Sequence, residues 1–196
     1  MDSAIDEILD FWFGQLDERG LSAPERHPLW FRKSDATDRR CRTEFGDTIE
    51  MALAGELDPW ASSNSGLMAL ILLLDQFPRN VYRNTPTAFA GDSRARELAL
   101  AAIDSGRHTG LPAIHRVFLY LPLEHSENLG DQDRCVALLT GLADEVGAEQ
   151  FHEFARYAHA HRQVIAQFGR FPHRNAILGR ESTAAELAYL EKHGGF

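Results

Sequence analysis

The chain has 196 residues, of which 44% are hydrophobic and 25% are charged, a composition typical of a globular protein that buries a sizeable core. Its net charge of -9 repels the phosphate backbone of nucleic acids, so we expect no nucleic-acid partner. The chain has no apolar run of about 18 residues, and it begins with acidic residues where a secretory signal carries basic ones. We therefore expect a cytoplasmic protein with no membrane partner.

Apolar residues recur with helical spacing in the first half of the chain. Residues 35–53 carry apolar side chains four residues apart, which predicts an amphipathic helix that ends before Gly55. The run 67–74 is apolar on every face and rich in Leu, which favours a buried central helix over a strand. A Phe-Pro pair follows each of two strongly apolar segments, and we expect Pro78 and Pro172 to end the helices there.

The second half of the chain repeats this pattern of apolar stripes bounded by glycine and proline. It predicts five further helices, over residues 92–105, 112–121, 131–146, 151–168 and 184–192. No segment shows the alternation of apolar and polar residues that a half-buried strand requires. We therefore predict a single all-α domain over residues 1–196, with about eight helices joined by short loops.

Several long motifs are shared with a known family. They are DFWFG (10–14), LDQFPRNVYR (74–83), AFAGD (88–92), YLPLEHSEN (120–128), DQ (131–132) and GRFPHRNAILGREST (169–183). With these motifs the chain resembles DUF924, a bacterial family of unknown function, from about Ile8 to Leu190. The resemblance implies an α-α superhelix similar to tetratricopeptide-repeat (TPR) folds, and it implies no established activity.

The most informative charge feature is a cationic stretch near the end of the chain. Residues 154–180 include five arginines, three histidines and no acid, so the stretch carries +5 with neutral histidines and the remainder carries -14. Two interpretations remain open. In the first, the arginines clamp the fold by pairing with carboxylates of other helices, such as Asp75, Glu124, Glu127 and Asp131. In the second, several arginines converge on a concave face and hold a small anion, either a carboxylate or a phosphate.

The second interpretation defines a candidate site. Its predicted ligand-binding side chains are cationic or carry an amide: Arg79, Arg116, Arg170, His173, Arg174, Asn175 and Arg180. Any catalysis is predicted to be acid–base chemistry by His125 or His161 with Glu127. His161 lies on the apolar stripe of its helix, whereas His159 points the opposite way, so these two cannot hold one metal ion.

The remaining alternatives concern metals and protein partners. A metal site of His125, Glu127 and His161 is one alternative, but no common metal or enzyme motif occurs, so we predict no metal and no cofactor. Another is an interaction module, because an arginine-lined groove in a superhelix suits an acidic peptide or protein tail. The expected partner is therefore a small anionic molecule or an acidic peptide. The sequence leaves open whether the protein is an enzyme and which oligomer it forms.

Overall fold

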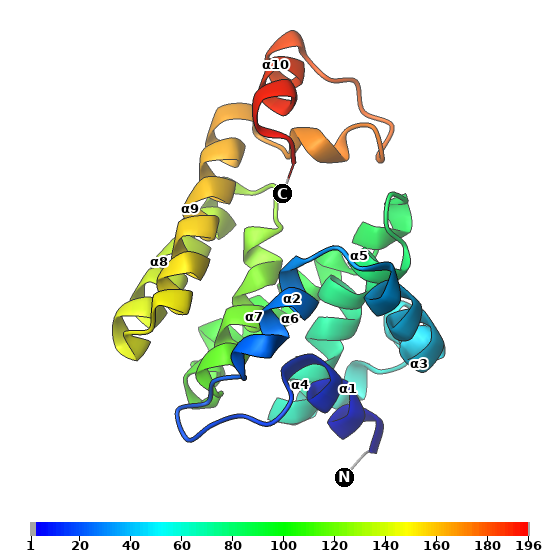
Figure 1. Cartoon of the computed structure of the whole chain (residues 1–196), viewed down its shortest axis with the longest axis vertical. Helices are drawn as coiled ribbons and strands as arrows, with labels where there is room; N and C mark the ends of the chain where they lie inside the picture. Colours follow the sequence, from blue (N-terminus) through cyan, green and yellow to red (C-terminus); the bar gives the residue numbers. More distant parts are fainter. Residues whose placement is uncertain (1–2, 196) are drawn as a thin grey trace. The chain divides into compact units, whose positions relative to one another are not determined.

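The computed structural model describes residues 3–195 and places most of them in helices (Figure 1). Within this range there are ten α-helical segments, eight of them eight residues or longer, and no β-strand. Leu16 and Ser22 form one isolated antiparallel bridge. The all-α class and the predicted number of long helices are confirmed. The superhelical, TPR-like arrangement and the single domain stay predictions.

The chain forms two compact units. Unit 1 comprises the residues up to Arg83 together with Thr87–Pro122, and unit 2 comprises Asn84–Pro86 together with the residues from Leu123 onward. Helix α7 belongs to unit 1 up to Pro122, and its last two residues belong to unit 2.

Unit 1 is built around the short apolar helix α4. Its α-helices are α1 (Ser3–Phe13), α2 (His27–Phe31), α3 (Asp35–Leu53), α4 (Asn64–Ile71), α5 (Phe77–Val81), α6 (Asp92–Asp104) and α7 (Ala113–Glu124). Short 3-10 helices connect them: η1 (Pro24–Arg26), η2 (Asp58–Ser62), η5 (Arg107–Gly110) and η4 (Pro86–Phe89), of which the first residue belongs to unit 2. Every residue from Gly66 to Ile71 is buried, and both α1 and α6 pack against α4. The central helix expected from the all-apolar run is therefore present.

The buried helix does not end at Pro78, so that prediction is wrong. Helix α4 continues through the π-helical segment η3 (Leu72–Gln76) into α5, and Pro78 lies in the first turn of α5. The π-turn shifts the hydrogen-bond register, which places proline where a helix needs no N–H donor. Helix α7 likewise continues past Pro122 to Glu124.

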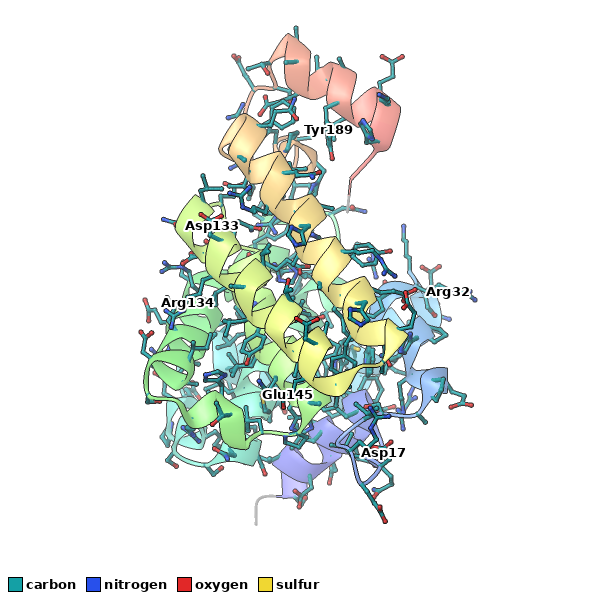
Figure 2. All side chains as sticks on the ribbon, turned by 90° about the vertical axis from the view of Figure 1, so that its left-hand side faces the viewer. Asp17, Arg32, Asp133, Arg134, Glu145 and Tyr189 are labelled. Carbon is teal, nitrogen blue, oxygen red and sulfur yellow. The ribbon has the colours of Figure 1, made fainter. Side chains whose placement is uncertain are left out.

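Unit 2 is a helical hairpin followed by a short C-terminal segment. Helices α8 (Leu129–Val146) and α9 (Glu149–Phe168) lie side by side along their lengths (Figures 1 and 2). The 3-10 turn η6 (Pro172–Arg174) and α10 (Ala184–His193) follow. The three helices predicted here are confirmed, with ends shifted by at most two residues. Helix α9 ends at Phe168 beside Gly169, so it stops before the second Phe-Pro pair.

Two further features concern the membrane and the cysteines. No helix within residues 3–195 is long and apolar enough to cross a membrane. Cys41 and Cys135 are buried and free. Burial raises the pKa of the Cys41 thiol to about 11, so this thiol stays protonated at neutral pH.

Gly91 provides a stability test of unit 1. It precedes α6, and a Cβ atom there would lie well under 3.0 Å from the carbonyl oxygen of Leu74 in η3. A Cβ atom on Gly141, exposed on α8, would meet nothing within 4 Å. We expect Gly91→Ala to lower the free energy of unfolding by about 1–3 kcal/mol through overpacking. Gly141→Ala should raise it by about 0.5–1 kcal/mol through helix propensity. Urea unfolding of both variants tests this, and effects of the same sign would contradict it.

Candidate functional site

Most predicted site residues lie in unit 2, on segments that border α9. His125 and Glu127 follow α7, and His161 lies on α9 itself. The remaining five predicted residues of unit 2 lie between α9 and α10: Arg170, His173, Arg174, Asn175 and Arg180. The other two predicted residues, Arg79 on α5 and Arg116 on α7, belong to unit 1.

His161 is the buried centre of this group. Its side chain faces the apolar side of α9 and the residue is only 7% exposed, whereas His159 on the opposite face is exposed, as the spacing predicted. The Nδ1 atom of His161 lies 2.9 Å from the carbonyl oxygen of Tyr157 and 3.4 Å from Oε1 of Glu124. A carbonyl oxygen can only accept a hydrogen bond, so Nδ1 carries the proton and Nε2 holds the lone pair.

Nitrogen-bearing side chains surround the ring of Phe171. The ring centroids of His161 and His173 each lie 5.6 Å from that of Phe171, and the guanidinium carbon of Arg174 lies 4.5 Å from it. The ring of His125 lies 6.4 Å from that of His161. Arg174 is buried and donates from Nη1 to the carbonyl oxygen of His125 at 3.0 Å. We call His125, His161, Phe171, His173 and Arg174 the histidine–arginine cluster.

The surroundings keep His161 neutral. The pKa of His161 is lowered to about 3, and the largest cause is burial, which removes water from the charged imidazolium. The hydrogen bond to the Tyr157 carbonyl opposes this shift, whereas the positive charges of the other cluster members add to it. Because burial and these positive charges outweigh the hydrogen bond to Tyr157, the ring is uncharged at neutral pH.

Arg180 is held by a carboxylate and by the backbone. Its Nη1 and Nη2 atoms donate to the two oxygens of Glu127 at 2.7 and 2.9 Å, and its Nε donates to Oδ1 of Asn175 at 2.9 Å. Glu127 also accepts the backbone N–H of Phe171 at 2.8 Å. Although burial opposes ionisation, the hydrogen bonds from Arg180 and Phe171 lower the pKa of Glu127. This two-point pair is the contact that the clamp interpretation predicts.

Arg170 is held in the same way at the start of α10. Its Nε and Nη2 atoms donate to the two oxygens of Glu186 at 2.6 and 2.9 Å. Glu186 also accepts the backbone N–H of Thr183, the capping residue of α10. The hydrogen bond from Arg170 is the largest cause that lowers the pKa of Glu186, to about 2. Arg170 and Arg180 thus fasten the segment between α9 and α10 at both ends.

The acid beside His161 is Glu124, not Glu127. From the sequence alone, Glu124 is expected only as an ion-pair partner for arginine. In the structure Glu124 is the last residue of α7 and is 5% exposed, whereas Glu127 is turned toward Arg180. No pattern along the chain distinguishes the two, because the difference arises where α7 ends beside α9.

The two predicted site residues of unit 1 have partners within that unit. Arg79 donates to both oxygens of Asp92, at 2.8 and 3.0 Å, and its Nη1 lies 3.5 Å from Oδ1 of the fully buried Asp75. Two carboxylates beside one guanidinium repel an anion. Arg116 donates from Nε to the hydroxyl of Tyr120 at 3.3 Å. Ligand binding by Arg79 and Arg116 stays a prediction.

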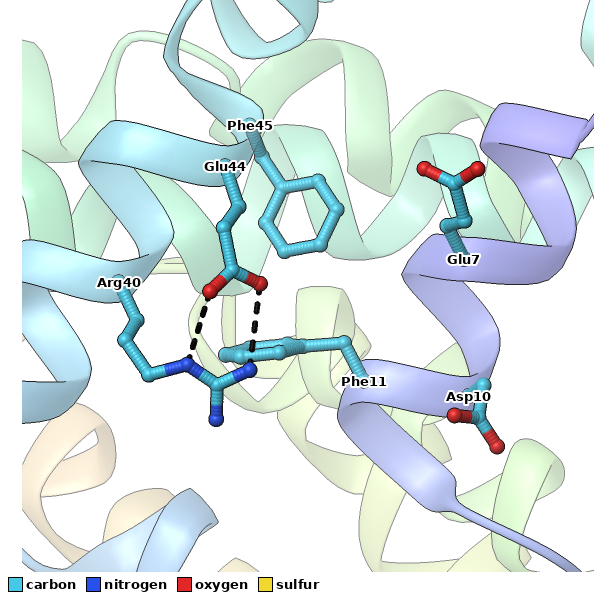
Figure 3. A pocket seen from close by; sticks show the side chains of 6 residues that line it. All are labelled: Glu7, Asp10, Phe11, Arg40, Glu44 and Phe45. Atoms are coloured by element: carbon cyan, nitrogen blue, oxygen red, sulfur yellow. Dashed lines mark hydrogen bonds and ion pairs between the residues drawn. The ribbon is translucent and has the colours of Figure 1, made fainter.

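A separate hollow lies in unit 1 between α1 and α3 (Figure 3). Its volume is about 380 Å³, and its lining consists of Glu7, Asp10, Phe11, Arg40, Glu44 and Phe45. Arg40 pairs with Glu44 at 2.9 Å and lies 4.7 Å from the centroid of Phe11. Three carboxylates and one guanidinium give this hollow a net negative charge, which does not suit the predicted anion.

A metal site was the remaining alternative to an anion site. Among residues 3–195, no three His, Cys, Asp or Glu side chains are arranged so that they could hold one metal ion. The alternative metal site of His125, Glu127 and His161 therefore does not form.

These features define an all-helical protein with a partly buried cluster of histidine and arginine next to one carboxylate. A family model described as "Bacterial protein of unknown function (DUF924)" matches residues 8–194, so the chain belongs to this family. It is similar to a solved structure entitled "Structure of Protein of Unknown Function ATU0120 from Agrobacterium tumefaciens". The two are 37% identical over 97% of this chain and 98% of that one, with a TM-score of 0.80. No curated protein matches the chain. The family resemblance is thus confirmed.

Proposed function

We propose that the protein binds a small anion, a carboxylate or a phosphate, at the histidine–arginine cluster. The observation that carries this proposal is the convergence of one guanidinium and two imidazoles on the ring of Phe171, with a third imidazole, that of His125, beside His161. Arginine presents a planar set of N–H donors that matches carboxylate and phosphate oxygens. The imidazoles of His125 and His173 each add one N–H donor when neutral, in either tautomer.

Preorganisation of Arg174 supports the proposal. Its guanidinium lies over Phe171 and is fixed by a hydrogen bond to the carbonyl of His125. The Arg174 side chain would therefore lose little conformational freedom when an anion binds. His125 and His173 are half-buried, which offers an approach from solvent to the deeper Arg174. In this proposal Arg170, Asn175 and Arg180 position the segment that carries Arg174 and do not contact the ligand.

A thermal-shift screen against phosphorylated and carboxylate metabolites tests this function. A ligand at 100 times its dissociation constant adds about 2.7 kcal/mol, which corresponds to a rise of roughly 5–11 °C for a chain of this size. We expect Arg174→Gln, if its circular dichroism stays native, to abolish the rise. Arg162→Gln is the matched control, because Arg162 pairs with Asp133 on the exposed side of the hairpin. A flat panel, or an equal rise in both variants, would contradict the proposal.

The second candidate is an interaction module that binds an acidic peptide or protein tail. The same cationic donors favour it, because a peptide carboxylate and a metabolite carboxylate present the same oxygens. A glutamate-rich peptide in the same screen separates the two functions. A shift with the peptide and none with any metabolite would favour the module. The cytoplasmic location expected from the sequence is part of either proposal.

A further inference from the structure

We propose that His161 is the general base of this anion site and that Glu124 is the residue that positions it. The inference rests on the proposed function, because the substrate is the anion held at Arg174. It goes further in assigning the protein to enzymes that remove a proton from a bound anionic molecule, or from a water molecule that attacks it.

The geometry fixes one tautomer and one orientation of the imidazole. The N–H at Nδ1 donates to the carbonyl of Tyr157 on α9 at 2.9 Å, and the carboxylate of Glu124 at the end of α7 lies 3.4 Å from the same nitrogen. The ring of Phe171 stands edge-on to the imidazole, at 77° with centroids 5.6 Å apart, and limits its rotation. The lone pair therefore stays on Nε2, which is the nitrogen that a general base needs unprotonated.

The proposed step is a single proton transfer. A bond forms between Nε2 and a proton, the bond from that proton to oxygen or carbon breaks, and its electron pair remains on the substrate. The imidazolium then carries a proton on each nitrogen, and Glu124 lies 3.4 Å from Nδ1, where a carboxylate stabilises the new charge. Arg174 is placed to stabilise the negative charge that develops on the substrate. No oxidant, reductant or further reactant is required.

Charge around His161 makes this base depend on the ligand. The ionisable groups that face it are Glu124 from α7, His125 after α7, and His173 and Arg174 from η6. An anion bound at Arg174 offsets the positive neighbours, which raises the pKa of His161 toward the range where an imidazole is an effective base. Binding of the anion and of the proton then favour each other, so the anion should bind more tightly as the pH falls.

Nitrogen-15 NMR of histidine-labelled protein tests the inference, with inorganic phosphate and acetate as probes. We expect His161 to carry its proton on Nδ1 from pH 5 to 8, and a saturating probe to raise its proton affinity at least tenfold. Glu124→Gln should lower the proton affinity of His161 both with and without the probe, because glutamine carries no charge to stabilise the imidazolium. Glu153→Gln, which removes an exposed carboxylate from α9, should leave both affinities unchanged.

The outcomes separate this inference from the proposed function. A proton on Nε2 of His161 in the wild type would overturn the general base, whatever the probes do. Probe-induced shifts at His125 and His173 without a change in the proton affinity of His161 would overturn the base but leave the anion site in place. An absence of shifts at all three histidines would overturn the anion site itself.

Discussion

Lowering the pH from 7 to 4 is expected to reduce the free energy of unfolding by about 3 kcal/mol through His161 alone. The pKa of His161 is about 3 in the folded protein, whereas an unfolded histidine titrates near its usual value of about 6.5. Below that value the unfolded chain binds a proton that the folded protein rejects. Stability is therefore lost as the pH falls from about 6.5 toward 3, by at most about 1.4 kcal/mol per pH unit.

Urea unfolding at several pH values measures this effect. We expect His161→Gln to have a shallower pH dependence than the wild type, by up to one bound proton between pH 6.5 and 4. His159→Gln, on the exposed face of the same helix, should keep the wild-type dependence. Part of the dependence should persist in both variants, because burial also lowers the pKa of His115 to about 4. An unchanged slope in His161→Gln would mean that this imidazole is not buried and neutral.

Replacing Glu127 by alanine is expected to lower the free energy of unfolding by about 2–4 kcal/mol. The change leaves Arg180 without its carboxylate and the backbone N–H of Phe171 without its acceptor. Removal of one partner from a fully buried pair costs about 3–5 kcal/mol, and this pair is partly exposed, with side chains 25% and 29% accessible. The loss should therefore fall somewhat below that range.

Asp133→Ala is the matched control for this prediction. It removes a carboxylate that pairs with Arg162 on the exposed side of α8 and α9, where the two side chains are 53% and 38% accessible. Exposed pairs contribute about 0–1 kcal/mol, so we expect little change. Urea unfolding compares the two variants, and a similar small loss in both would show that Glu127 does not fasten the segment after α9.

The helices could be predicted because their signals are local. Residues 35–53 form α3 with the predicted bounds. Both signals for this helix, the regular apolar stripe and the glycine that follows it, lie within one short segment of the sequence. The same periodicity placed His161 inside the core. The π-helical segment before Pro78 could not be predicted in this way, because its register depends on packing of the surrounding helices and not on the residues of the turn alone.

The candidate site depends on contacts that are distant in sequence. The cationic stretch indicated where arginine and histidine gather, but the partner of each arginine was open. Arg180 reaches Glu127 and Arg170 reaches Glu186, which are separated from them by 53 and 16 residues. These two pairs fit the clamp interpretation, whereas Arg174 lies over an aromatic ring among histidines. One stretch thus combines residues that hold the fold with residues that we propose bind the ligand.

Anomalous diffraction from a crystal soaked in selenate tests the proposed anion site. Selenate is a tetrahedral dianion like phosphate, and its selenium atom can be located without reference to the protein density. We expect a selenium peak within hydrogen-bond reach of the Arg174 guanidinium and of His125 or His173. Peaks confined to exposed arginines and lysines, with none at the histidine–arginine cluster, would contradict it.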